Sequence, residues 1–141
     1  MAVKFFSEVI SYTLKKKKQT TTWINNSIRE ENRISGELNI IFTSDKYLLG
    51  INKQYLKHNY FTDIVTFNYC ENDIISGDIF ISIETVKNNS ARFDVNYTTE
   101  LKRVIIHGIL HLIGYDDQND EEKAIIRQKE NYYLERLKNL S

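Results

Sequence analysis

Two histidines four residues apart, followed by a glycine and two aspartates, form the part of this sequence best suited to chemistry. His107 and His111 lie in an apolar stretch with a helical pattern. Because side chains at positions i and i+4 share one face of an α-helix, the two imidazoles can converge on one metal ion. Gly114 can end the helix and turn the chain back, since glycine accepts the left-handed conformation common at helix ends.

The turn after Gly114 carries the candidates for a third ligand. Tyr115 is followed by Asp116 and Asp117, and either carboxylate can complete a site with the histidines. Three protein ligands leave a coordination position open, as in catalytic rather than structural metal sites. An ion bound there would lower the pKa of its water toward about 7 and polarise an oxygen of the substrate, and both effects serve hydrolysis. Taken alone, two histidines on an apolar helix are more often hydrogen-bonded core residues.

The residue after the first histidine is Gly108. In the helical protease motif His-Glu-x-x-His, that position holds the glutamate that acts as general base. A glycine there argues against a metalloprotease of that type, and it leaves the base unidentified.

The elements that position these residues follow from hydrophobic periodicity and capping residues. We expect strands over 3–7, 37–43, 64–69 and 79–83, the last opened by Gly77 and Asp78. We expect helices over 20–31, 45–55, 84–93, 98–113 and 119–140, with Thr98 or Thr99 as the cap of the fourth. The fourth helix is apolar on nearly all sides, which predicts that it is buried at the centre. The sum is a single α+β domain over 1–141, a small mixed β-sheet with helices packed on it, whose central helix carries both histidines.

The composition is that of an ordinary globular domain. The chain has 141 residues, of which 41% are hydrophobic, and no apolar run approaches the roughly 20 residues needed to span a bilayer. The segment from Met1 to Leu14 has Glu8 within its apolar part and does not resemble a signal peptide. A single cysteine, Cys70, cannot form an internal disulfide. We therefore expect a cytoplasmic protein with no membrane association.

The formal net charge is zero, but the charge is unevenly distributed. From Met1 to Lys57 there are ten Lys and Arg residues against five Asp and Glu. The run Lys15-Lys16-Lys17-Lys18 makes this part locally basic, and such a patch can engage phosphates. Without further support we interpret it as a solvated loop.

The run from His107 to Asp117 resembles the signature of the YbeY-type endoribonucleases, His-Gly-x-Leu-His-Leu-x-Gly-Tyr-Asp-His. Further blocks agree in order and spacing: Asn52 to Tyr55, Thr62 to Phe67, similar to the family's Thr-Asp-Val-Leu-Ser-Phe, and Gly77 to Ile79, similar to its Gly-Asp-Ile. The resemblance implies a metal-dependent, single-strand-specific endoribonuclease of rRNA maturation, acting at the 3′ end of 16S rRNA and in ribosome quality control. It also implies rRNA and the ribosome or ribosomal proteins as partners.

Asp117 stands where the family has its third histidine. The register therefore favours His107, His111 and Asp117 as the metal ligands and catalytic group, rather than a set with Asp116. A carboxylate binds zinc well, at about 2.0–2.2 Å, so we expect one Zn²⁺ ion. Two histidines and a carboxylate also suit ferrous iron, so another divalent metal stays open.

Leu56 is a second departure, because the family has there an arginine associated with RNA phosphate. Three residues close by in sequence can supply a cation to the same cleft: Lys53, Lys57 and His58. The family match adds Thr62 and Asp63 as cleft candidates, and both can equally be turn or capping residues. It also offers Asp63 and Asp78 as candidate bases.

Two rival functions remain. One is a ribosome-assembly factor with little or no catalysis and a structural metal, which the leucine at position 56 favours. The other is a metallohydrolase of another substrate, which would turn over small esters or peptides and leave RNA intact.

Overall fold

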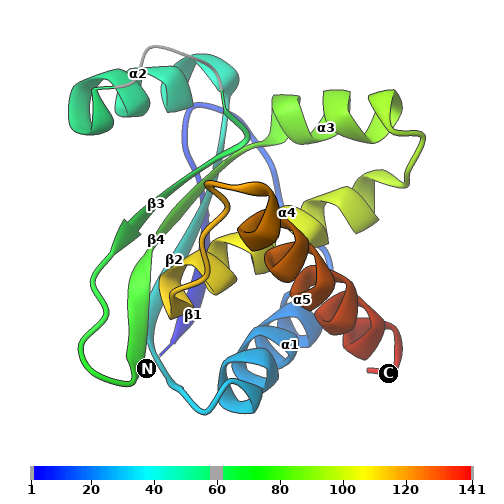
Figure 1. Cartoon of the computed structure of the whole chain (residues 1–141). Coiled ribbons are helices and arrows are strands. Elements are labelled where there is room, and N and C mark those ends of the chain that lie inside the picture. Colours follow the sequence, from blue (N-terminus) through cyan, green and yellow to red (C-terminus); the bar gives the residue numbers. More distant parts are fainter. Residues whose placement is uncertain (1, 58–61, 141) are drawn as a thin grey trace.

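A four-stranded mixed sheet is the scaffold of the chain in the computed structural model, which describes residues 2–57 and 62–140 (Figure 1). The strand order is β1-β2-β4-β3. Strands β1, β2 and β4 are parallel, and β3 is antiparallel to β4. Their bounds are Val3–Ser7 for β1, Ile34–Thr43 for β2, Ile64–Asn68 for β3 and Ile74–Ser82 for β4.

Five helices complete the described part of the chain. They are α1 (Lys17–Glu30), α2 (Asp45–Leu56), α3 (Ile83–Arg92), α4 (Tyr97–Ile113) and α5 (Asp120–Lys138). Helix α4 crosses one face of the sheet, and α1, α3 and α5 lie against α4 (Figure 1). Within residues 2–57 and 62–140, no helix is both long and apolar enough to cross a membrane.

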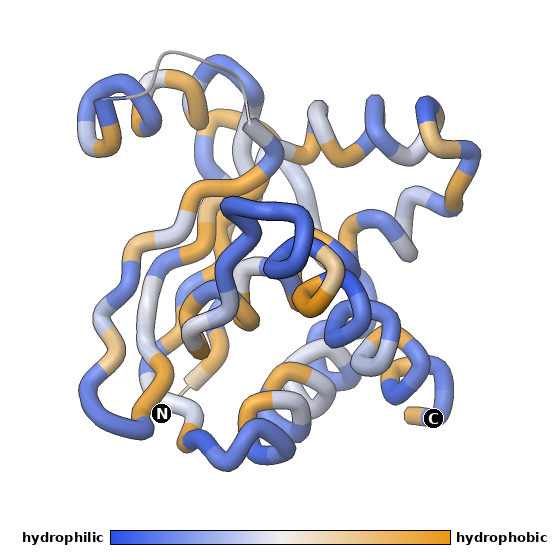
Figure 2. Tube along the Cα trace, in the orientation of Figure 1, coloured by the Kyte–Doolittle hydropathy of each residue, from blue (hydrophilic) through white to orange (hydrophobic). Residues whose placement is uncertain are grey.

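Helix α4 is the central buried helix, as its sequence predicts. Four core residues around its middle are fully buried: Ile105, Ile106, Ile109 and Leu110. They pack against the residues of β2 and β4 that point to the same face of the sheet, in keeping with the two-residue period of a strand. Figure 2 shows the apolar stretches along the strands and the hydrophilic loop that follows α4.

Two glycines let α4 lie close to the sheet. A Cβ atom on Gly108 would lie 2.8 Å from Cδ1 of Ile64 and 3.0 Å from Cγ2 of Ile79. On the sheet side, a Cβ atom on Gly77 would lie 2.4 Å from the carbonyl oxygen of Phe67 and 3.0 Å from Leu112. The absence of side chains at both positions therefore sets the spacing between helix and sheet.

The opposite face of the sheet is partly covered by α2. A second cluster of buried residues forms there from Leu48, Ile51 and Val65, with Phe67 and Phe80 packed against it. The ring of Phe67 meets that of Phe80 edge-on, with centroids 5.9 Å apart. This cluster fixes α2 beside β3, at the end of the sheet nearest the histidines.

The α+β class is confirmed, while several element bounds differ from expectation. The cap of α4 is Asn96 rather than Thr98 or Thr99, because its Oδ1 accepts hydrogen bonds from the amides of both threonines at 2.8 and 3.4 Å. Strand β4 begins at Ile74, so Gly77 and Asp78 lie inside it, paired with both neighbouring strands.

The tetralysine run is not simply a loop. Lys17 and Lys18 form the first turn of α1, and Lys16 occupies its cap position with a left-handed φ of 56°. The interpretation as a loop is wrong for the second half of the run.

One carboxylate joins three parts of the chain. Glu31, at the end of α1, accepts hydrogen bonds from the Tyr115 hydroxyl at 2.7 Å, from Lys129 Nζ at 3.0 Å and from the Tyr133 hydroxyl. Burial raises the pKa of Glu31, but the hydrogen bonds from Tyr133, Tyr115 and Lys129 outweigh it and hold that pKa below its usual value. We call these four residues the Glu31 junction.

The lowered pKa predicts acid sensitivity. A carboxyl with a folded-state pKa below its unfolded value contributes stability that is present above the unfolded value and is lost as pH falls through the folded one. We expect Glu31→Gln to lower the free energy of unfolding at neutral pH by about 1.5–3 kcal/mol and to flatten its decline below pH 4.5. Urea unfolding of both proteins across this pH range measures the effect, with exposed Glu135→Gln as control. An acid decline as steep in Glu31→Gln as in the wild type would contradict it.

The close approach at residue 108 also gives a stability prediction. Gly108→Ala forces the ends of Ile64 and Ile79 to move, so we expect a loss of about 1–3 kcal/mol in the free energy of unfolding. Gly50→Ala is the matched control, because residue 50 is also helical and its added methyl meets nothing within 4 Å. Helix propensity alone predicts that the control gains up to about 1 kcal/mol. Equal effects of the two substitutions in denaturant titrations would show that the contacts with Ile64 and Ile79 do not penalise a side chain at residue 108.

Candidate metal centre

Helix α4 and the turn after it bring three predicted ligands together. His107 and His111 lie one helical turn apart, with their Nε2 atoms 3.0 Å from each other. Gly114 ends the helix with φ 127°, and its amide donates to the carbonyl of Leu110. The chain then returns over the histidines, where Oδ2 of Asp117 lies 3.4 Å from His107 Nε2 and 3.5 Å from His111 Nε2.

This triangle has the dimensions of a metal-ligand set. Bonds of about 2.0–2.1 Å in tetrahedral geometry place neighbouring ligand atoms about 3.3 Å apart. The three observed separations of 3.0, 3.4 and 3.5 Å bracket that value. His107, His111 and Asp117 therefore fit a divalent ion with a fourth position left open. Asp116 is exposed and lies outside this group of ligand atoms.

Glu130 of α5 orients the first histidine. Its Oε2 lies 2.6 Å from His107 Nδ1, and its Oε1 accepts a hydrogen bond from Arg103 at 2.9 Å. Because Nδ1–H donates to the carboxylate, Nε2 keeps its lone pair for a metal. Burial raises the pKa of Glu130, but the hydrogen bonds from His107 and Arg103 outweigh it and lower the pKa overall. The Glu130 carboxyl is thus held ionised behind the histidine.

Two hollows open beside the ligand triangle. The first, of about 400 Å³, lies between α2, β3 and α4. It is lined by Asn52, Leu56, Thr62, Asp63, Ile64, Val65, Thr66, His107, His111 and Asp117. The second, of about 270 Å³, lies between α4 and α5 and shares Asp63, His107 and Asp117 with the first. The candidate cleft residues Thr62 and Asp63 therefore lie at the site.

Asp63 is the candidate base that the fold brings to the histidines. Burial raises the pKa of its carboxyl, although the nearby His107 opposes the shift. Asp78 points to the opposite face of the sheet, where its Oδ1 accepts a hydrogen bond from Asn39 at 2.9 Å. The hypothesis that Asp78 serves as a base is therefore not supported by its position.

The cations near the site come from other elements than expected. Lys53 and Lys57 are exposed and line neither hollow, and His58 lies outside the described residues. Three cations line the second hollow instead: Arg103 of α4 and Lys123 and Arg127 of α5. Sequence reasoning missed them and Glu130. A signal for Glu130 was its place between Ile126 and Tyr133 on the apolar stripe of α5.

Comparison with known proteins agrees with this geometry. A family model described as Endoribonuclease YbeY matches residues 4–138. Proteins named Endoribonuclease YbeY from Bacteroides thetaiotaomicron and Bacteroides fragilis are 46% and 47% identical over 134 residues, which is 95% of this chain and 98% and 96% of theirs. A solution structure of a Thermotoga maritima protein, 26% identical, superposes with a TM-score of 0.68 over 96% of this chain and 89% of that one. With the family model and these relatives spanning nearly its whole length, the chain belongs to the YbeY endoribonuclease family.

Proposed function

We propose that this chain is a metal-dependent endoribonuclease that cuts single-stranded RNA, acting on the 3′ end of 16S rRNA and in ribosome quality control in the cytoplasm. The observation that carries the proposal is the ligand triangle of His107, His111 and Asp117, open to two hollows. The names of the relatives support the activity. The choice of rRNA, and of the ribosome or its proteins as partners, rests on the family resemblance.

Zinc is the ion we propose for the centre. Two imidazole nitrogens and one carboxylate oxygen with an open position are a typical zinc donor set, although ferrous iron accepts the same ligands. A divalent ion held there supplies a water of lowered pKa and a Lewis acid for the phosphoryl oxygen.

The chain's own residues divide the remaining work. Glu130 holds a proton on His107 Nδ1 and so keeps Nε2 free. Asp63 lines both hollows, and its raised pKa lies nearer to neutral pH than that of an ordinary aspartate. A carboxyl with such a pKa is suited to move a proton between the attacking and leaving oxygens. Arg103, Lys123 and Arg127 provide positive charge for the phosphates on either side.

Leu56 favours a second candidate function. It lines the first hollow, where an arginine would contact phosphate directly. A ribosome-assembly factor with a structural ion and little cleavage would tolerate this leucine. The two functions differ in whether the ion is needed for cleavage or for folding.

Loss of a ligand separates the two functions. We expect His111→Ala to abolish cleavage of single-stranded rRNA and to remove the bound zinc. The protein should stay folded, because the hydrophobic core does not include this side chain. Mass spectrometry of bound metals, an RNA cleavage assay and thermal melting measure the three effects, with Asp116→Asn as the control. Unfolding of the variant, together with a much lower melting temperature of metal-free protein, would favour the structural ion.

The carboxylate behind His107 gives a finer test. We expect Glu130→Gln to weaken zinc affinity by about 10–100-fold, because a neutral amide orients the histidine less strongly. Competition with a chelating dye measures the affinity. Glu135→Gln is the matched control, since residue 135 is on the same helix but exposed. Equal affinities in the two variants would show that Glu130 does not support the ligand.

A further inference from the structure

A third hollow, which shares no lining residue with the two at the histidines, is lined by four lysines. We call it the lysine pocket: Lys15 and Lys16 before α1, Lys102 in α4 and Lys138 in α5, with Gln19, Thr98, Thr99, Leu134 and Leu137. Its volume is about 340 Å³, which is within the size range of small-ligand sites. None of these lining residues carries a carboxylate, so the pocket combines positive charge with an apolar floor.

Lys102 is the least expected of these residues, because it is buried. Its exposed fraction is 6%, and its Nζ donates to Thr20 Oγ1 at 3.1 Å. In the described residues its ammonium has no ion pair with a carboxylate. Burial and the positive charge of Lys16 lower its pKa. Since an unpaired buried charge is costly, an anion that enters the pocket would offset this cost.

The N-terminus of α1 also favours a bound anion. Helices α2 to α5 each begin with a Ser or Asn side chain that accepts an amide hydrogen bond. Helix α1 has no side-chain cap and no acidic residue in its first turn, and Lys16 occupies the cap position. Its unsatisfied amides and the positive end of its dipole therefore face further positive charge.

The lysine pocket and the second hollow beside the metal centre lie along the same face of α5. Lys123 and Arg127 of the second hollow and Leu134 and Lys138 of the lysine pocket are spaced by four, seven and four residues, so they share one face of α5. Between them, Arg103 bridges from α4 to Asn131 at 2.9 Å. From residue 123 to residue 138 the helix rises about 22 Å. A strand of phosphates that follows the seam between α4 and α5 therefore passes from one hollow to the other.

We propose that the lysine pocket binds a backbone phosphate of the single-stranded RNA whose reacting phosphodiester lies at the metal centre. The inference rests on the proposed nuclease function. Lys102 is the fixed charge of the pocket, while Lys15 and Lys16 are exposed and adapt to the strand. Lys138 takes part from the rim, where its Nζ lies 3.7 Å from the Glu135 carboxylate. A free phosphate ion shares this chemistry, and the test separates the two sources.

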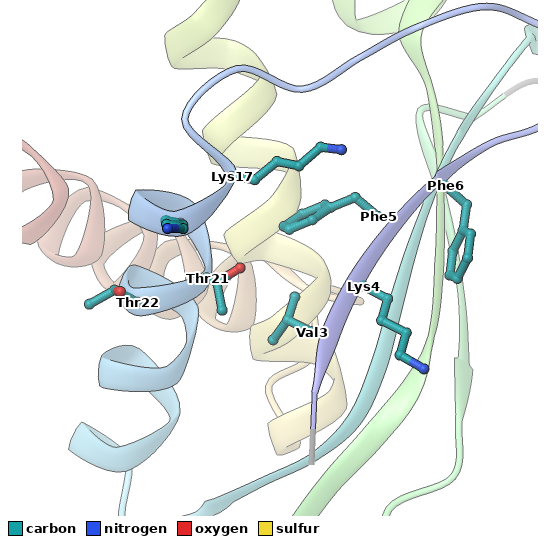
Figure 3. A pocket seen from close by; sticks show the side chains of 8 residues that line it. Val3, Lys4, Phe5, Phe6, Lys17, Thr21 and Thr22 are labelled. Atoms are coloured by element: carbon teal, nitrogen blue, oxygen red, sulfur yellow. The ribbon is translucent and has the colours of Figure 1, made fainter.

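The tetralysine run offers its own matched control. Lys17 and Lys18 line a different groove, between β1 and α1, where Figure 3 shows Lys17 above Phe5. Neither residue lines the lysine pocket. Lys15→Gln/Lys16→Gln and Lys17→Gln/Lys18→Gln thus remove the same charge from the same segment. Only the first pair changes the lysine pocket.

The test is the salt dependence of binding between single-stranded RNA and the full chain, measured by fluorescence anisotropy in a His111→Ala background that does not cleave. We expect Lys15→Gln/Lys16→Gln to weaken binding equally for RNAs of different sequence. It should also reduce the slope of log affinity against log salt by about 1 or more, with the control pair unchanged. In the cleaving protein the same pair should raise KM and leave kcat unaltered. Equal effects of the two pairs, or no effect of either, would overturn the proposal.

A second variant guards against misfolding. Lys102→Met keeps the stem of the side chain and removes the charge, so we expect weaker RNA binding with thermal stability equal to or above that of the wild type. Lower stability with unchanged RNA binding would show that Lys102 is only structural.

Titration with inorganic phosphate, followed by amide chemical shifts of Thr98 and Thr99, is the remaining experiment. Phosphate binding that Lys15→Gln/Lys16→Gln abolishes, with RNA affinity intact, would assign the pocket to a small anion. If no form binds RNA, the proposed nuclease function itself fails.

Discussion

The close contact between α4 and the sheet at Gly108 is the constraint on which the site depends. It places the ends of Ile64 and Ile79 where any side chain at residue 108 would lie. The same contact holds His107 and His111 beside β3, and it excludes an acid–base residue between them. A side chain that moves a proton would therefore belong to a neighbouring element, and Asp63, the residue before β3, lines both hollows at the histidines.

The third ligand needs a different kind of support, because it lies in a loop. Asp117 is partly exposed, and only two residues separate it from the end of α4 at Gly114. The Glu31 junction binds Tyr115 within this turn and links it to α1 and α5. Since α5 also provides Glu130 to His107, both the loop ligand and the helix ligand are positioned by one helix.

Much of this arrangement follows from local sequence, and the rest depends on tertiary contacts. Periodicity predicted the buried helix, and spacing predicted that His107 and His111 converge. The choice of Asp117 over Asp116 came from the resemblance to the family. Lys53 and Lys57 show that closeness in sequence does not by itself place a side chain in the cleft. Asn52 and Leu56, four residues apart, face the first hollow, whereas Lys53 and Lys57 lie one position further around the helix and face solvent. Arg103 lies one turn before His107 on α4, so local spacing could have indicated it. Arg127 and Glu130 reach the site only because α5 packs on α4, and no local pattern encodes that contact.

The charges around the centre suggest why a second phosphate site is useful. The second hollow holds four carboxylates, Asp63, Glu100, Asp117 and Glu130, against the three cations Arg103, Lys123 and Arg127. Without a divalent ion these carboxylates outnumber the cations, so an ion held by the ligand triangle would also help to bind the reacting phosphate. The lysine pocket, at the other end of α5, has no lining carboxylate and is positive whether or not the ion is bound. A chain with zero net charge can thus hold a polyanion by separating its charges, with the permanent positive charge placed away from the metal ligands.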